Sequence, residues 1–81
     1  MTPKHLLTLV GQPGCHVGHD MRAIVDGVAA PLGFTVEERD VRDRDDWARY
    51  LIEIPVVLYG EREVVRHRTT PDELARLLRA L

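Results

Sequence analysis

The stretch LLTLVGQPGCHVG, residues 6–18, determines how the rest of the chain is interpreted. An apolar run leads into a turn rich in glycine and proline, and the only cysteine, Cys15, stands where a helix is predicted to begin. The free amides and the dipole of a first helical turn favour an anionic thiolate, and a turn leaves the sulfur near the surface. The stretch therefore favours a reactive Cys15 over the buried structural cysteine that a lone one more often is.

Composition and charge restrict the class of protein. The 81 residues leave no room for a second core, so we expect one domain over residues 1–81. A net charge of −2 provides no basic field for nucleic acid, and no apolar run approaches the ~18 residues of a membrane span. No secretory leader is recognisable, and one cysteine cannot form an internal disulfide. We expect a cytoplasmic monomer without nucleic-acid or membrane partners.

The first half of the chain is predicted to form a strand, a helix and a strand. A continuous apolar run predicts a central strand over 5–10, and alternation predicts a half-buried edge strand over 34–38. Apolar residues at helical spacing predict a helix from residue 15 or 16 to about 32, closed by Pro31 and Gly33. The connection is so short that the two strands are predicted to be parallel.

The second half is predicted to form a hairpin and a final helix. Strands over 54–59 and 63–66 are joined by a turn at 60–62. Thr70, Pro71 and Glu73 predict a helix start with a capping box, and the helix carries a buried stripe of Leu74, Leu77, Leu78 and Leu81. The order β-α-β-(α)-β-β-α predicts an α/β domain, a mixed four-stranded sheet with helices on both faces.

Two segments leave alternatives open. The charged segment 40–50 is either a solvated connector pinned by Trp47 or a short helix with Trp47, Tyr50 and Leu51 on one side. Proline cannot donate to a strand ladder, so Pro55 is awkward at the start of an apolar strand, and a cis Ile54–Pro55 bond is one resolution.

Two histidines follow Cys15 closely. His19, four residues on, shares a helix face with Cys15, where its protonated form would favour the thiolate and could protonate a departing thiol. The alternative is that His16 and His19 are solvated surface residues. Cys15, His16 and His19 offer only three ligands where structural zinc takes four, so no metal is expected. His5 and His67 fall in strand-like segments elsewhere and are expected to be structural or exposed.

Together these features resemble the glutaredoxin family of the thioredoxin-like superfamily, especially its small bacterial glutaredoxin-like members. The resemblance covers essentially the whole chain and rests on two motifs in this order, QPGCH at residues 12–16 and IPVV at residues 54–57. It implies a thioredoxin-like fold, Cys15 as the nucleophile, and a cis Pro55 that faces it.

The resemblance also implies a substrate site. The Ile54 backbone would pair with a bound peptide or glutathione strand. The substrate would be a thiol or disulfide, with glutathione as a co-substrate or a protein cysteine as the partner, and no other cofactor. The implied substrate-binding residues are Gly14, His16, Val17, Gly18, Ile54, Pro55 and Asp72.

The chain departs from the family pattern at Gly18, where relatives usually carry a second cysteine. Cys15 then cannot release a mixed disulfide internally, so an external thiol must do so. Gln12 also stands where relatives that bind glutathione tend to carry a basic residue, and residues 69–72 replace their Gly-Gly-Asp-type turn, of which only Asp72 matches. Two hypotheses follow: a monothiol glutaredoxin-like oxidoreductase of cell redox homeostasis, or a degenerate thioredoxin-fold module that binds a partner without redox turnover.

Overall fold

The strand that leads toward Cys15 lies inside the sheet. The structure is a computed structural model that describes residues 5–12 and 16–81, and for residues 16–20 it describes the backbone alone. The strand order is β2-β1-β3-β4; β1 pairs parallel with β2 and antiparallel with β3, and β3 pairs antiparallel with β4. The mixed sheet, the parallel first pair and the edge position of β2 are confirmed. The strands are β1 (Leu6–Gly11), β2 (Thr35–Asp40), β3 (Val56–Tyr59) and β4 (Arg62–Arg66).

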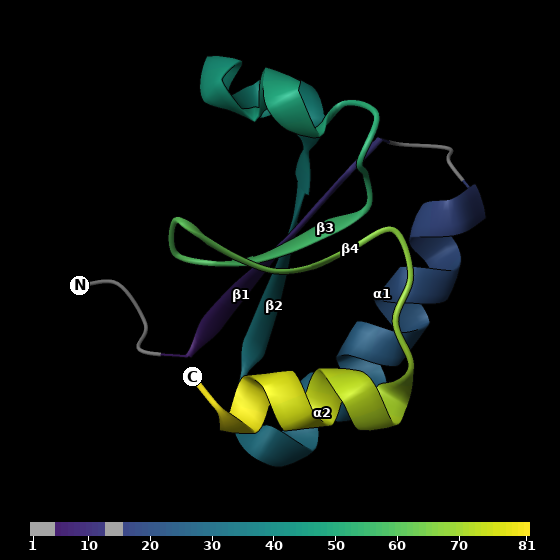
Figure 1. The fold of residues 1–81 in the computed structure, drawn as a ribbon, viewed down its shortest axis with the longest axis vertical. Coiled ribbons are helices and arrows are strands. Elements are labelled where there is room, and N and C mark those ends of the chain that lie inside the picture. Colours follow the sequence, from purple (N-terminus) through teal and green to yellow (C-terminus); the bar gives the residue numbers. More distant parts are fainter. Residues whose placement is uncertain (1–4, 13–15) are drawn as a thin grey trace.

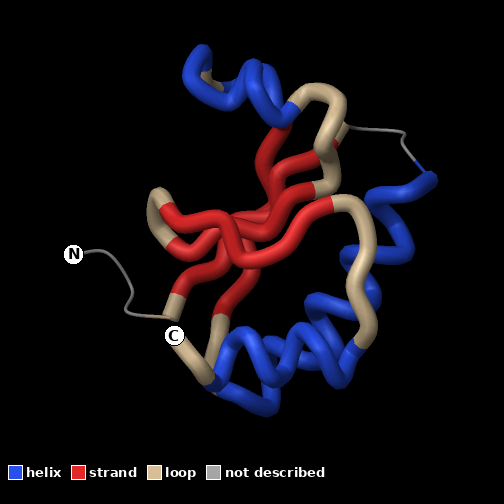
Figure 2. The backbone as a smooth tube through the Cα atoms, in the orientation of Figure 1, coloured by secondary structure: helices blue, strands red, loops and turns tan. Residues whose placement is uncertain are grey.

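Helices α1 (His16–Ala29) and α2 (Pro71–Arg79) cover one face of the sheet (Figures 1 and 2). The regular helix α1 ends three residues before the predicted boundary, and a 3₁₀ turn, η1 (Ala30–Leu32), continues it. Pro31 lies in this turn and cannot donate an N–H to an α-helical bond. Gly33 ends the turn with a φ of 85°, the left-handed cap that the sequence predicts. The buried side chains between helices and sheet are Leu7, Leu9, Met21, Val25, Ala29, Val57, Leu74 and Leu78.

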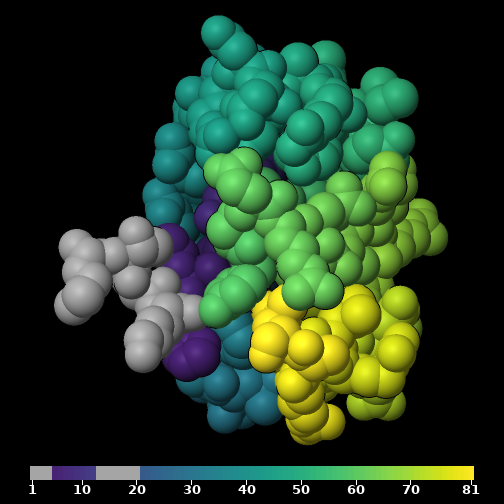
Figure 3. All heavy atoms as spheres, turned by 60° about the vertical axis from the view of Figure 1, so that its left-hand side comes forward, coloured from purple at the N-terminus to yellow at the C-terminus, as the bar shows by residue number. Residues whose placement is uncertain are grey.

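Two 3₁₀ helices, η2 (Val41–Asp43) and η3 (Asp45–Tyr50), pack on the other face. Trp47 is only 4% exposed and Tyr50 is also buried, so the charged segment is a short helix rather than a solvated connector. The placement of Leu51 on the buried side is wrong, because this side chain is 54% exposed. A 3₁₀ helix has three residues per turn, which aligns positions 47 and 50 and rotates position 51 away. In Figure 3 these residues (teal) form a layer above the hairpin (green).

The hairpin and α2 follow the prediction closely. Gly60 turns the chain with a φ of 64°, and β3 begins at Val56, two residues later than predicted. The Thr70 hydroxyl accepts a bond from the Glu73 backbone N–H (3.2 Å), which is one half of the predicted capping box. A complete capping box instead joins Asp40 and Asp43 at the start of η2.

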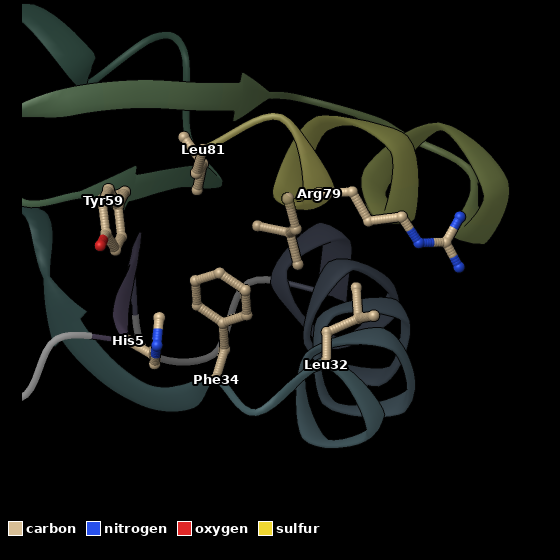
Figure 4. A pocket seen from close by; sticks show the side chains of 7 residues that line it. His5, Leu32, Phe34, Tyr59, Arg79 and Leu81 are labelled. Carbon is tan, nitrogen blue, oxygen red and sulfur yellow. The ribbon is translucent and has the colours of Figure 1, made fainter.

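The predicted leucine stripe of α2 is correct at its centre and wrong at its end. Leu74 and Leu78 are buried, Leu77 is half-buried, and Leu81 is 39% exposed because it lies beyond the last residue of α2. Leu81 borders a shallow, mainly apolar hollow between the sheet and α2 (Figure 4). In this hollow the Phe34 ring meets His5 and Tyr59 edge to face, with centroids 5.3 and 6.0 Å away.

Candidate functional site

Two segments that the sequence singles out leave the sheet at the same end. Val10, near the end of β1, lies opposite Val56, the first residue of β3, in an antiparallel register. The chain beyond Val10 leads toward Cys15, and the residue before Val56 is Pro55. Both positions are fixed, because Val10 and Val56 are completely buried under η2 and η3. The candidate site therefore lies at this end of the sheet (Figure 1).

The Ile54–Pro55 peptide bond is cis, as the resemblance implies. Pro55 is buried and Ile54 is half-buried. The backbone N–H and C=O of Ile54 form no hydrogen bond with any residue that the structure describes. Among the described residues Ile54 thus has no backbone partner, as an edge that accepts an added strand requires. Whether Pro55 faces Cys15 lies outside the described residues.

The segment before Pro55 is held on both sides. The Glu53 backbone N–H donates to the Tyr50 carbonyl (2.7 Å), and the His67 N–H donates to the Pro55 carbonyl (2.9 Å). The Glu53 carboxylate also lies 2.9 Å from His67 Nε2 and 3.4 Å from Arg66 Nη1. Sequence reasoning did not identify Glu53, and it expected no specific contact for His67. Glu53 and His67 are 14 positions apart, and no local sequence pattern predicts a contact over that separation.

The residues around the cysteine are placed only in part. Helix α1 begins at His16, as predicted, so His16, Val17, Gly18 and His19 belong to its first turns. Their side chains, together with Gly14 and Cys15, lie outside the described residues. The pairing of Cys15 with His19 therefore stays a prediction.

Asp72, the remaining predicted substrate residue, is exposed in the first turn of α2. Its carboxylate forms no ion pair with another described residue. Helix α2 lies at the end of the molecule away from η2 and η3 (Figure 1). A role for Asp72 in binding stays a prediction.

A hollow of about 350 Å³ lies beside the end of β1, lined by Gly11, Gln12, Glu38, Arg39 and Asp40. Its charged side chains are already paired: Glu38 with Arg22, Arg39 with Glu37 and Asp43, and Asp40 with Arg42. The charged side chains among the described lining residues are therefore all paired, and none of them is a free cation for an anionic substrate.

The acidic segment that follows β2 is structural. The Arg42 side chain and the Arg42 backbone N–H both bond to the Asp40 carboxylate, and they lower the pKa of Asp40 to about 2. Asp43 and Asp46 pair with Arg39 and Arg44 at 3.0 and 2.6 Å. The lowered pKa of Asp40 makes this carboxylate unsuited to proton transfer near neutral pH, and the arginine partners of Asp43 and Asp46 give these two side chains a structural role.

The part of the chain that the structure describes, residues 5–12 and 16–81, shows neither a candidate metal site nor a membrane span. These residues contain no group of three or more histidine, cysteine or acidic side chains that could hold a metal ion. None of the helices among them combines the length and apolar character of a membrane span. The side chains of Cys15, His16 and His19 lie outside the described part of the chain.

Comparison with known proteins identifies a family for nearly the whole chain. The model of the family described as "Glutaredoxin-like domain (DUF836)" matches residues 6–79. This span contains all four strands, both α-helices and the two converging segments of the site. No curated protein matches the chain.

Proposed function

The chain belongs to the glutaredoxin-like domain family, and on this premise we propose that it is a monothiol thiol–disulfide oxidoreductase with Cys15 as its nucleophile. Its substrates in this proposal are mixed disulfides of glutathione or of a protein cysteine. The proposed setting is the reducing cytoplasm, where an unpaired thiol persists and the protein acts as a monomer.

The proposed reaction has two exchange steps. The Cys15 thiolate attacks one sulfur of the substrate disulfide, a bond to Cys15 Sγ forms, and the substrate S–S bond breaks. The departing thiolate takes up a proton, for which His19 is the proposed donor. An external thiolate then attacks the substrate sulfur of the mixed disulfide. A new disulfide forms between these two sulfurs, the bond to Cys15 Sγ breaks, and Cys15 leaves as a thiolate. One substrate disulfide is reduced and the external thiol is oxidised.

One observation carries the proposal: the segment that leads to Cys15 and the Ile54 backbone edge leave the sheet at the same end. The Val10–Val56 pairing fixes this arrangement. The Ile54 backbone can then pair with an extended substrate. In this arrangement the reactive sulfur of the substrate lies near the end of β1. The start of α1 at His16 gives further support, because the amides of a first turn favour a thiolate on the preceding residue.

The second candidate is a binding module without redox turnover. It is favoured by Gly18, since the chain has no second cysteine to resolve a mixed disulfide. Such a module would still use the Ile54 edge to hold a partner, but its binding would not depend on the Cys15 thiol.

A turnover assay with a glutathionylated peptide and reduced glutathione separates the two functions. We expect multiple turnovers by the wild type and none by Cys15→Ser. The control His5→Ala, at the other end of β1, should retain wild-type turnover. If wild type and Cys15→Ser bind the peptide equally and neither turns it over, the binding module is the correct function.

A further inference from the structure

We propose that Glu53 and His67 are positioning residues that hold the Ile54 backbone edge in place for substrate. This inference deepens the proposed function and rests on it. Glu53 directly precedes Ile54 in the loop between η3 and β3, and His67 directly follows the last residue of β4. Their side chains meet through the 2.9 Å contact between His67 Nε2 and the Glu53 carboxylate. We call this pair the Glu53–His67 clamp.

The clamp ties the loop at two points. The His67 side chain holds Glu53, and the His67 backbone N–H bonds to the Pro55 carbonyl (2.9 Å). Ile54 lies between these two attachments, and its own backbone N–H and C=O bond to no described residue. His67 thus fixes the flanks of the edge and leaves the edge itself free to accept a strand.

The backbone of His67 is in an unfavourable conformation. Its φ is 64°, and the Arg68 N–H donates to the Arg66 carbonyl (2.8 Å), which closes a three-residue γ-turn around His67. Residues with a Cβ rarely adopt this φ. At the opposite end of β4 the chain has the same φ of 64° at Gly60, where glycine adopts it without strain.

The side chain of His67 therefore contributes something that a glycine could not. Among the described side chains, Glu53 is the only one with which the His67 side chain interacts. The His67 side chain is 53% exposed. Exposed ion pairs add little to the stability of a fold. His67 has a strained backbone, and its side-chain contact stabilises the fold only weakly. Its role is therefore better explained by its hold on the loop that carries Ile54 than by a contribution to the stability of the fold.

The neighbouring charged residues allow the contact between Glu53 and His67 to be tested separately from the overall charge of the hairpin. Arg66 also reaches Glu53 (3.4 Å), but its closer partner is Glu63 (3.0 Å) on the same hairpin. Glu63→Gln therefore changes the charge of the hairpin and leaves the clamp intact. This variant is the matched control for Glu53→Gln and His67→Gly.

The test compares thermal stability, steady-state kinetics and amide hydrogen exchange in the full chain. His67→Gly relieves the strained φ, so its thermal midpoint should equal or exceed that of wild type. With a glutathionylated peptide we expect KM to rise about fivefold with kcat unchanged, the effect of losing one exposed side-chain contact. Exchange at the amides of residues 53 and 67 should become faster. Asparagine tolerates a left-handed φ and carries a side-chain donor. The KM of His67→Asn should therefore lie between the KM of wild type and that of His67→Gly.

The outcomes distinguish the clamp from the proposed function. If the wild type is active and both KM and exchange are unchanged in His67→Gly and Glu53→Gln, the clamp is wrong. If KM rises only together with a lower thermal midpoint, the residues are merely structural and the proposal is also wrong. If the wild type is inactive but exchange becomes faster in His67→Gly and not in Glu63→Gln, the clamp stands and the proposed function fails.

Discussion

Val10 in β1 lies directly opposite Val56 in β3, and this pair sets where the site is built. Both side chains are completely buried in the cluster that Trp47 and Tyr50 cover. The chain segments that extend from this pair, one toward Cys15 and one from Pro55, therefore start from fixed points. The candidate site is therefore anchored by a buried pair at this end of the sheet.

Gly18→Cys should create an intramolecular disulfide with Cys15 under mild oxidant. The substitution creates the Cys-X-X-Cys spacing that the resemblance implies for the family, and with Cys15 directly before α1, as proposed, we expect residues 15 and 18 to lie close enough to bridge. The measurement is loss of thiol titre at unchanged mass of the monomer, with Ala23→Cys, in the third turn of α1, as the control. A Gly18→Cys protein that stays fully reduced would show that Cys15 does not precede the helix as proposed.

Trp47→Ala should lower the free energy of unfolding by about 3–5 kcal/mol, because it empties the centre of the cluster beneath η3. The change also removes the ring that Arg39 and Arg44 flank at 5.6 and 5.1 Å. Urea unfolding measures the loss, and the milder Trp47→Phe keeps the test valid if the alanine variant does not fold. The control is Ile52→Ala, which removes a side chain that is 81% exposed and should change stability by less than about 0.5 kcal/mol.

Thr70→Ala should destabilise the protein by about 1 kcal/mol, because the Glu73 backbone N–H loses its capping acceptor. Thr69→Ala is the matched control, since the Thr69 hydroxyl does not cap α2. Equal urea midpoints for the two variants would contradict the assignment of Thr70 as the cap.

Asp40→Asn should make stability less dependent on pH in the acidic range. The pKa of Asp40 is about 2 in the folded protein, below its ordinary value of 3.8, so the ionised carboxylate stabilises the fold above pH 3.8. This contribution is lost as the pH falls from 3.8 toward 2. Asparagine retains a helix-capping oxygen, so the variant isolates the charge. Urea unfolding should show a deficit at pH 6 that shrinks below pH 3.8, and a constant deficit would refute the cause.

The sequence predicts most of the fold because its local patterns agree with one another. Apolar strands, the helical stripe of α1 and the Thr70 start of α2 all appear where predicted. The sequence predicts two side chains as buried that the structure exposes. Leu51 points outward because η3 is a 3₁₀ helix, and Leu81 is exposed because it lies past the end of α2. Both errors assume a regular α-helix at positions where the chain does not form one.

The candidate site is predictable only in part. The Ile54–Pro55 segment follows from the family motif, and its cis bond is confirmed. The Glu53–His67 clamp could not be predicted, since it joins two loops through a contact that no periodicity reports. A positive φ at a histidine is likewise invisible in the sequence.

The proposed function requires Cys15 to be an activated thiolate, and the alkylation rate of the wild-type protein as a function of pH measures this property. Cys15 is the only thiol in the chain, so the reaction reports on this residue alone. We expect an inflection well below ~8.5, the pKa of an ordinary cysteine thiol. An inflection near ~8.5, or a thiol that does not react, would contradict the claim and leave the binding module as the function.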